Sequence, residues 1–367
     1  MTSNRTREMT PFIVMDVLEK AHEMERRGVH VVHLEVGEPD FDTPRCIKEA
    51  ACKALDNGHT HYTHSLGMIE LREAISEHYS KAYGVTVDPD QIVISSGTSP
   101  AMFVMFSALL EKGDQVIVSD PHYACYPNFI KFVQGNPVFV PVYEEDGFQY
   151  RPKAIEKKIT PNTKGIFINS PSNPTGNLLS KERMAAIAEL SLKPDSPYII
   201  SDEIYHGLVY EGKEHSILEF TKRAFVFNGF SKLYAMTGLR LGYMIAPKHF
   251  IIAALKEAGE DISRMKQIYN ERRQHMIRRL KDMGLGITVE PTGAFYVFAN
   301  AKHISSDSYK LAFDILEKAH VGVAPGIGFG KNGEGYLRFS YATSMENITE
   351  GLDRLENYLK HHDHKIG

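Results

Sequence analysis

The sequence predicts an α/β protein with a mostly parallel sheet flanked by helices and a second, smaller α+β domain. Between residues 91 and 246, short apolar runs alternate with segments of helical periodicity. Strands that are separated by helices need crossover connections, which join parallel strands and cover both faces of the sheet. The chain has 367 residues, and a single core seldom grows beyond about 250–300 residues, so we expect two domains.

The N-terminal segment is expected to contribute one helix, one strand and a loop. Apolar residues recur at helical spacing from Pro11 to Arg27, and the run Val31–Val36 favours a short strand. Residues 37–44, GEPDFDTP, contain prolines and a glycine, which favour a loop. Helices are expected at Pro44–Leu55 and after Gly67, where a polar loop turns into an amphipathic segment.

The central region supplies the predicted sheet. Its strands are expected at the apolar runs Ile92–Ile94, Gln115–Val118, Val138–Val142, Gly165–Ile168, Tyr198–Ile200, Ala224–Phe227 and Gly242–Ala246. The intervening helices are expected at Ser99–Leu110, Tyr126–Val133, Pro152–Lys158 and Ser180–Leu192. Because ligands of such sheets bind beyond the carboxyl ends of the strands, the polar residues that end these runs are expected on one rim.

The last third of the chain has a different pattern and is expected to form the smaller domain. Long helical segments at Asp261–Met283 and Asn347–Leu359 flank strand-like runs at Phe295–Phe298 and Tyr336–Tyr341. We expect three parts: an N-terminal arm that also joins the small domain (1–44), a large ligand-binding domain (45–248) and a small C-terminal domain (249–367).

Two motifs in the sequence are expected to have no ligand. The glycines of a G-x-G-x-x-G pattern are Gly328, Gly330 and Gly333. This dinucleotide fingerprint has meaning only between a strand and a helix, and here it leads into a strand, so no nicotinamide site is expected. His61 and His64 lack a third ligand nearby, and no metal site is expected.

The composition excludes several classes of protein. The formal net charge of −4 argues against a nucleic-acid partner. No stretch reaches the roughly 18 apolar residues that a membrane span needs, and the charged start is not followed by the apolar run of a secretory signal. The three cysteines Cys46, Cys52 and Cys125 cannot all pair and fit no metal signature, which indicates reduced thiols in a cytoplasmic protein.

One lysine on the predicted rim favours a covalent chemistry. Lys232 follows the apolar run Ala224–Phe227, and a desolvated ammonium is costly unless it is paired or loses its proton. Such a lysine can act as an imine-forming nucleophile. Elsewhere on the rim, Gly97 and small hydroxyl residues precede a helix, an arrangement that suits a phosphate.

Four motifs in the order and approximate spacing of one known family occur between Leu34 and Tyr341. They are NPTG (173–176), SDE-x-Y (201–205), SK-x(7)-R-x-G (231–242) and R-x-S (338–340). With these motifs the chain resembles the pyridoxal-phosphate-dependent aminotransferases of class I/II and fold type I, the aspartate aminotransferase-like enzymes. The resemblance implies pyridoxal 5′-phosphate as cofactor, bound in the large domain.

The resemblance implies the roles of three catalytic residues. Lys232 corresponds to the lysine that forms the Schiff base with the cofactor and then moves a proton at the substrate Cα. Asp202 corresponds to the aspartate that keeps the pyridine nitrogen protonated, so that the ring can accept electrons. Tyr205 and Asn173 correspond to the side chains that bond the phenolic oxygen of the cofactor.

The resemblance also implies the residues that bind the phosphate and the substrate. The phosphate and ring contacts would come from the amides of Gly97, Thr98 and Ser99 and from Tyr123, Ser231, Arg240 and, across a subunit boundary, Tyr62. Arg338 would take the substrate α-carboxylate in a two-pronged pair, with Gly37 and Asn173 beside it. Gly229 stands where relatives often have a serine, so the phosphate is expected to lose one hydroxyl contact.

The implied enzyme is a homodimer with shared active sites that moves an amino group from an L-amino acid to a 2-oxo acid. A cysteine-sulfur β-lyase on the same frame, and a regulator that binds the cofactor without catalysis, stay open as alternatives. Aspartate, an aromatic or a branched amino acid are all possible donors. Thr98 and Ser99 provide no lysine for a second carboxylate, which weakens the case for a dicarboxylate.

One departure from the family concerns the chain after Pro247. Relatives usually carry a further glutamine- and asparagine-rich segment before the helix at residue 261, whereas this chain continues directly. Either the chain lacks that segment, or a disordered segment near residues 250–254 has been left out of the sequence. We favour the second explanation.

Overall fold

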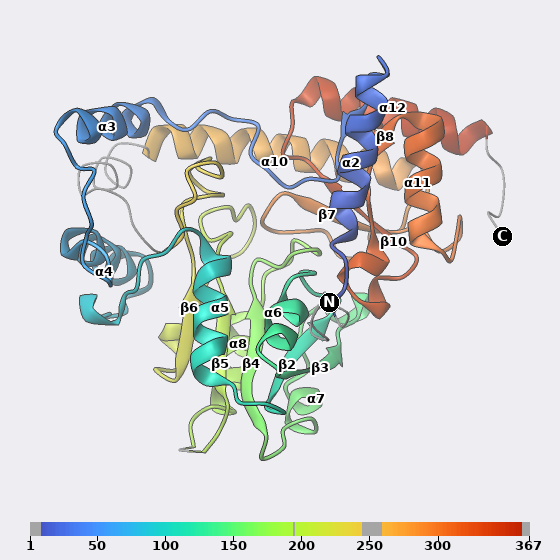
Figure 1. The fold of residues 1–367 in the computed structure, drawn as a ribbon. Helices are drawn as coiled ribbons and strands as arrows, with labels where there is room; N and C mark the ends of the chain where they lie inside the picture. Colours follow the sequence, from blue (N-terminus) through green and yellow to red (C-terminus); the bar gives the residue numbers. More distant parts are fainter. Residues whose placement is uncertain (1–8, 194, 244–258, 362–367) are drawn as a thin grey trace, which may run out of the picture.

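The main body of the protein is a five-stranded parallel sheet (Figure 1). The computed structural model describes residues 9–193, 195–243 and 259–361, with residues 259–265 described for the backbone only. The strand order is β3-β2-β4-β5-β6, and every neighbouring pair is parallel. The strands are β2 (Gln115–Asp120), β3 (Asn136–Pro141), β4 (Thr163–Asn169), β5 (Tyr198–Asp202) and β6 (Ala224–Phe227). The predicted parallel sheet is confirmed.

Helices cover both faces of this sheet, because its strands are apolar on both sides. Ile166 and Ile168 of β4 pack in a cluster with α7 (Pro152–Glu156) and α8 (Lys181–Glu189). Phe167, between them, points to the other face and packs with α5 (Thr98–Leu109) and α6 (Tyr126–Phe132). Successive side chains of a strand alternate between faces, so a strand buried on both sides reads as one continuous apolar run.

A second body is built from both ends of the chain. An antiparallel sheet joins β7 (Tyr296–Asn300), β10 (Tyr336–Ser340) and β9 (Ala324–Pro325), and β1 (Val32–His33) pairs with β8 (Val321–Gly322). Its helices are α2 (Ile13–Arg26), α10 (Gly259–Asp282), α11 (Ser308–Ala319) and α12 (Met345–His361).

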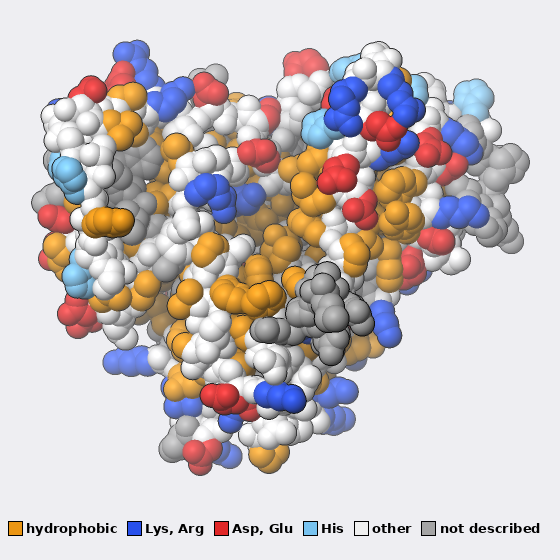
Figure 2. Space-filling view, in the orientation of Figure 1, with side chains coloured by type: hydrophobic (Ala, Val, Ile, Leu, Met, Phe, Trp, Pro, Cys, Tyr) orange, Lys and Arg blue, Asp and Glu red, His pale blue; other side chains and the backbone are white. Residues whose placement is uncertain are grey.

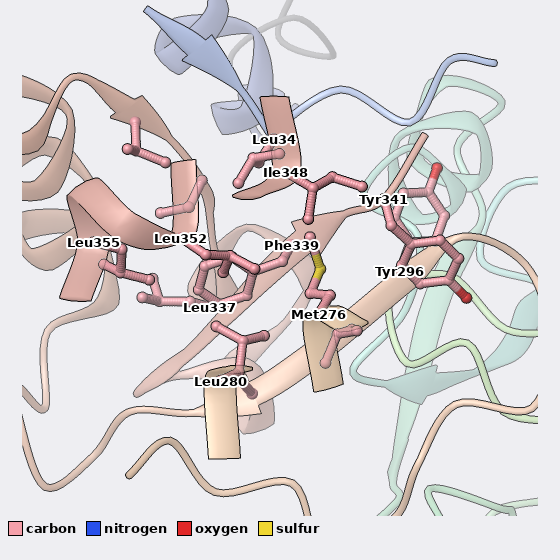
Figure 3. Close-up of a cluster of buried hydrophobic side chains, with 14 of the residues drawn as sticks. Leu34, Met276, Leu280, Tyr296, Leu337, Phe339, Tyr341, Ile348, Leu352 and Leu355 are labelled. Carbon is pink, nitrogen blue, oxygen red and sulfur yellow. The ribbon is translucent and has the colours of Figure 1, made fainter. Parts of the chain in front are cut away.

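One apolar core holds the N-terminal segment against the last third of the chain. Leu34 packs in the same cluster as Phe339 of β10 and Ile348 of α12 (Figure 3). On the face shown in Figure 2, apolar side chains also gather between this second body and the body that carries the main sheet. The second body therefore has the α+β composition that the sequence predicted, and the domain boundaries stay a prediction.

Three sequence-based expectations about strands and helices differ from the structure. Ile92–Ile94 is not a strand, because Ile92 and Ile94 are instead buried against α4 (Ile69–Tyr83). The strand expected at Val31–Val36 is reduced to the two residues of β1, and α11 was not predicted. Of the strand expected at Gly242–Ala246, Gly242 forms a single bridge with Gly229, and residues 244–246 lie outside the described residues.

The other predicted helices agree with the structure, whereas the short strands β8 and β9 were not predicted. The helix expected at Pro44–Leu55 is α3 (Arg45–Asp56), which lies above α4 at the left of Figure 1. The glycine pattern at 328–333 forms two short turns that lead into β10, as the sequence predicted, and does not join a strand to a helix as a dinucleotide loop does. Within the described residues, no helix is long and apolar enough to cross a membrane.

Candidate active site

The predicted rim residues meet at the carboxyl edge of the main sheet. Asn169 and Asp202 end β4 and β5 and face each other in the strand register. Lys232 follows the end of β6, and its Nζ donates to the carbonyl oxygen of Gly37 at 2.7 Å. Parallel strands place their carboxyl ends on one edge, so residues distant in sequence reach one site.

The pKa of the Lys232 amine is lowered toward neutral pH. Its side chain is half-buried. Burial lowers the pKa of Lys232 to about 8, and the positive charges of Arg338 and Arg240 act in the same direction. The nearby carboxylate of Glu38 opposes this shift. The neutral, nucleophilic amine is therefore much more populated at neutral pH than for an ordinary lysine, whose pKa is about 10.4.

Asp202 is a buried carboxyl with two hydrogen-bond donors. Tyr126 donates its hydroxyl to Oδ2 at 2.7 Å, and the amide of Ile204 donates to Oδ1 at 3.2 Å. Burial raises the pKa of Asp202 to about 6, while Tyr126, the Ile204 amide and Lys232 lower it. The carboxylate is thus kept available to a cationic partner.

Tyr126 is a residue of this site that the sequence did not single out. It begins α6 three residues after Tyr123, and the two rings meet edge to face with centroids 5.2 Å apart. The spacing of three residues was the available signal, because positions i and i+3 share one side of a helical turn.

Arg338 is a buried guanidinium on β10. Its Nη1 donates to the side-chain oxygen of Asn173 at 3.0 Å, and Nη2 donates to the carbonyl oxygen of Glu35. Its Nε has no partner among the described residues. The rings of Tyr296 and Phe329 lie 4.3 and 4.8 Å from its guanidinium carbon. Fixed among these groups, Arg338 still has an unsatisfied donor.

A comparison with the other buried arginines sets Arg338 apart. Arg72, Arg272 and Arg273 are buried to a similar degree. Each pairs with a carboxylate, of Asp90, Asp40 and Glu211 respectively. In the described part of the chain, Arg338 has no such ion pair. A buried charge without a counter-charge is costly, so an anion is expected to bind there.

Tyr296 is a second residue that the sequence did not single out. Its hydroxyl lies 3.1 Å from that of Tyr205, which was predicted to contact the cofactor. A Cβ added to Gly37 would stand 1.7 Å from the Tyr296 hydroxyl, so only glycine leaves room for this ring. Tyr296 thus joins Tyr205, Gly37 and Arg338 in one buried group.

The N-terminus of α5 brings together most of the groups expected at the phosphate. Gly97 is its N-cap, with φ of 99°, and a Cβ there would meet a guanidinium nitrogen of Arg240 at 2.6 Å. The amides of Thr98 and Ser99 begin the helix. The amide of Gly97, expected at the phosphate, instead donates to the carbonyl oxygen of Ser95 at 2.8 Å. The dipole of α5 and the charge of Arg240 favour a phosphate here.

The structure explains the glycine at position 229. A Cβ on Gly229 would lie 2.6 Å from the Cα of Gly242, and a Cβ on Gly242 would lie 2.7 Å from the amide nitrogen of Thr98. The two segments and the start of α5 approach too closely for side chains. The lost hydroxyl is therefore a consequence of backbone packing.

The remaining predicted residues divide into two groups. Ser231 is buried next to Lys232, and the ring of Tyr123 lies at the start of α6 against Phe12, with centroids 5.8 Å apart. Tyr62 is fully exposed. Within one chain, Tyr62 therefore does not join the buried part of the site.

These residues fit a phosphate-bearing aromatic cofactor with a carbonyl group. A glycine-lined helix N-terminus with an adjacent arginine suits the phosphate, and the buried carboxyl of Asp202 suits a cationic ring nitrogen. The amine of Lys232, with its lowered pKa, suits a carbonyl carbon. The unpaired Arg338 remains for a substrate carboxylate.

Comparison with known proteins agrees with this geometry. The family model for aminotransferases of class I and II matches residues 29–261 and 248–355. A (5-formylfuran-3-yl)methyl phosphate transaminase of Methanocaldococcus jannaschii is 41% identical, over 98% of this chain and 100% of that protein. An aspartate aminotransferase of Pyrococcus horikoshii is 41% identical, over 95% and 94%. The solved structure of an alanine aminotransferase from Pyrococcus furiosus has a TM-score of 0.93 and 32% identity, over 99% and 100%.

The same comparison bears on the segment after Pro247. The two matched segments overlap at residues 248–261, and the alignment with the M. jannaschii enzyme spans 385 positions, more than the 367 residues of this chain. The relative therefore contains residues that this chain lacks, as both explanations predict. Residues 244–258 lie outside the described residues, and the omission of a segment near residues 250–254 stays a prediction.

The motifs, the fold and the relatives lead to one conclusion. The chain belongs to the class I and II aminotransferase family, of fold type I, and is a pyridoxal-phosphate-dependent aminotransferase.

Proposed function

We propose that this aminotransferase acts on L-amino acids that carry a single carboxylate, with an aromatic or branched side chain, and passes the amino group to a 2-oxo acid. The observation that carries the proposal is Arg338, the buried arginine without a carboxylate partner in the described residues. One such arginine supports one bound carboxylate.

Neighbouring groups support an apolar rather than an acidic substrate side chain. The aromatic rings of Phe295, Tyr296 and Phe329 are buried around Arg338 and Lys232. Arg272, a further buried cation, is already neutralised by Asp40 at 2.7 Å. A second substrate carboxylate would find no free buried guanidinium among the described residues.

Different residues of the site would perform different steps of the reaction. Bound pyridoxal phosphate supplies the electron sink for the charge that develops at the substrate Cα. Lys232 would be its attachment point and would then move the proton at Cα, a task for which a pKa of about 8 is well placed. Asp202, held by Tyr126, would keep the ring nitrogen cationic. Arg240 and the first amides of α5 would hold the phosphate.

Arg338 and its neighbours would orient the substrate. A two-pronged pair between a guanidinium and a carboxylate fixes both position and angle. Arg338 also donates a hydrogen bond to Asn173, which is expected at the phenolic oxygen of the cofactor. The bound carboxylate and the cofactor would therefore be held at a fixed distance and orientation relative to each other. Such pre-positioning lowers the entropic cost of reaching the transition state.

An amino-donor screen on cofactor-loaded enzyme tests the proposal. Phenylalanine, tyrosine, leucine, valine, alanine and aspartate are compared with and without 2-oxoglutarate. We expect turnover that depends on the oxo acid and favours aromatic or branched donors. A preference for aspartate would contradict the proposed side-chain class, and release of pyruvate and ammonia from cysteine conjugates without oxo acid would indicate a β-lyase.

Reduction with borohydride tests the attachment point. Digestion and mass spectrometry of the reduced enzyme are expected to find the cofactor on the peptide that contains Lys232. An adduct on a different lysine, or no adduct after reconstitution, would contradict the assignment of this residue.

We also infer a homodimer with shared active sites in the cytoplasm. The full exposure of the aromatic ring of Tyr62, on a loop away from its own site, supports a contact across a subunit boundary. The free thiols of Cys46, Cys52 and Cys125 support a reducing compartment. Light scattering after size exclusion tests the dimer, and a fully active monomer would contradict it.

A further inference from the structure

Two histidines and a glutamate gather on the second body, away from the active site. His22 and Glu25 lie on α2, and His33 is the last residue of β1. One ligand atom from each of the three lies within 4.8 Å of the others. The carboxylate of Glu25 bridges them, with Oε2 at 2.8 Å from Nδ1 of His22 and Oε1 at 3.0 Å from Nε2 of His33.

A fourth residue fixes the ring of His33. Its Nδ1 lies 2.6 Å from Oε1 of Glu35, whose side chain is fully buried. In the part of the chain that the structure describes, Oε2 of Glu35 has no hydrogen-bond partner. Histidines that bind metals usually donate their other ring N–H to a carboxylate or carbonyl, which sets the tautomer and turns the free nitrogen toward the metal. Glu35 stands in that position relative to His33.

Glu25 lies between the two histidines, and each of its carboxylate oxygens faces one ring nitrogen. Without a metal, such a histidine and carboxylate are joined by a proton. A metal ion placed among these atoms would take the place of those protons, since metal ligands bind in their deprotonated form.

We propose that His22, Glu25 and His33 bind a divalent transition metal of the Zn²⁺ type, with Glu35 positioning His33. Imidazole and carboxylate are ligands of this class of metal, and three protein ligands leave a fourth position for water. Two of the ligands lie three residues apart on one helix, so they share a face. The half-exposed ring of His22 gives the ion access from solvent.

The site would tie α2 to the segment that supports the substrate arginine. Glu25 and His22 come from α2, and His33 precedes Glu35, whose backbone carbonyl accepts from Arg338. A bound ion would replace hydrogen bonds with shorter, stronger contacts between these elements. The expected role is structural, since the ligands lie outside the group that meets the cofactor.

Calorimetric titration of the cofactor-loaded enzyme with Zn²⁺, and with Co²⁺ as a spectroscopic probe, tests the proposal. We expect one tight site per chain, a visible absorption band of bound Co²⁺, and an increase of about 2 °C or more in Tm with saturating metal. His22→Ala and Glu25→Gln are expected to weaken binding at least tenfold and to abolish the Tm increase.

Two controls separate this site from other histidines. His30→Ala removes an exposed histidine that lies 3.7 Å from Glu350, and it is expected to leave metal binding unchanged. Because His361, His362 and His364 cluster near the C-terminus, only the difference between the wild type and the His22 or Glu25 variants counts. Equal binding by wild type and His22→Ala, or no tight binding by the wild type, would overturn the proposal and leave a proton-bridged ion pair.

Discussion

Arg338 of β10 donates to the side-chain oxygen of Asn173, 3.0 Å away and 165 positions earlier in the chain. Asn173 belongs to the loop that follows β4, so this contact joins the antiparallel sheet of one body to the carboxyl edge of the parallel sheet of the other. It links the residue expected to bind the substrate carboxylate to a residue expected at the cofactor. The position of each therefore depends on how the two bodies meet.

Arg338→Lys is expected to raise KM for the amino donor about 10–100-fold, because a lysine cannot make the two-pronged pair and one or two charge-assisted bonds are lost. The affinity for the cofactor should change much less. Steady-state kinetics and a cofactor titration measure the two effects separately. Arg72→Lys, at a buried arginine paired with Asp90, is the matched control and should leave KM unchanged. Equal losses in substrate and cofactor affinity would indicate a structural role for Arg338.

The attachment of the cofactor to apoenzyme is expected to accelerate as pH rises through about 8, the lowered pKa of Lys232. The neutral amine is the nucleophile, and it makes up about a tenth of the population at pH 7 for a pKa near 8. Stopped-flow absorbance between pH 6 and 10 measures the rate. A midpoint near that of an ordinary lysine would contradict the proposed environment, and Lys232→Ala should form no visible chromophore.

Tyr126→Phe is expected to shift the acid limb of kcat/KM to higher pH by roughly half a pH unit or more, the equivalent of one hydrogen bond. Burial raises the pKa of Asp202 to about 6, and the Tyr126 hydroxyl lowers it, so removal of the donor raises that pKa further. The activity depends on the ionised carboxylate and is lost as pH falls through the pKa. A uniform decrease in kcat/KM at every pH would instead indicate loss of packing.

Glu203→Gln is expected to remove a pH dependence of stability. Burial raises the pKa of Glu203 to about 8, above its unfolded value of about 4.3. Between these values the folded state binds one more proton than the unfolded state, so the free energy of unfolding falls as pH rises from about 4.3 to 8. Above about pH 8, Glu203 contributes no further pH dependence. The loss is on the order of a few kcal/mol.

The neutral amide should keep the hydrogen bonds that Ser201 and the Ile217 amide donate to Glu203, at 3.0 Å each, without this loss. Urea unfolding at a series of pH values compares the slopes. Glu189→Gln, at an exposed glutamate, is the control and should behave like the wild type. An unchanged slope in Glu203→Gln would mean that Glu203 is ionised in the folded state.

Gly37→Ala is expected to destabilise the protein by about 1–3 kcal/mol and to raise KM for the amino donor, because the new Cβ would stand 1.7 Å from the Tyr296 hydroxyl. The ring would have to move, and with it the contacts to Tyr205 and Arg338. Gly238→Ala is the control, since a Cβ there meets no atom of the described residues within 4 Å. Wild-type stability in both variants would show that the Tyr296 ring can move aside without a loss of folding free energy.

Much of the fold and most of the predicted site could be derived from sequence because these features are local or follow from one topological rule. Continuous apolar runs specify strands that are buried on both faces, as in β4 with Ile166, Phe167 and Ile168. Once the strands are parallel, the residues after them share one edge, which is why Asp202 and Lys232 could be placed together. The run Ile92–Ile94 was misassigned because buried apolar side chains can also pack against a helix without a strand ladder.

By itself, the sequence determined the parallel sheet, the order of the site residues along the chain and the chemistry that a lysine, an aspartate and two arginines make possible. Only the tertiary structure decided that Tyr126 holds Asp202, that Tyr296 fills the space against Gly37, and that Arg338 has no carboxylate partner in the described part of the chain. The first two contacts join residues that lie 76 and 259 positions apart. Local spacing carries no information on such contacts, because they form only when distant parts of the chain pack together.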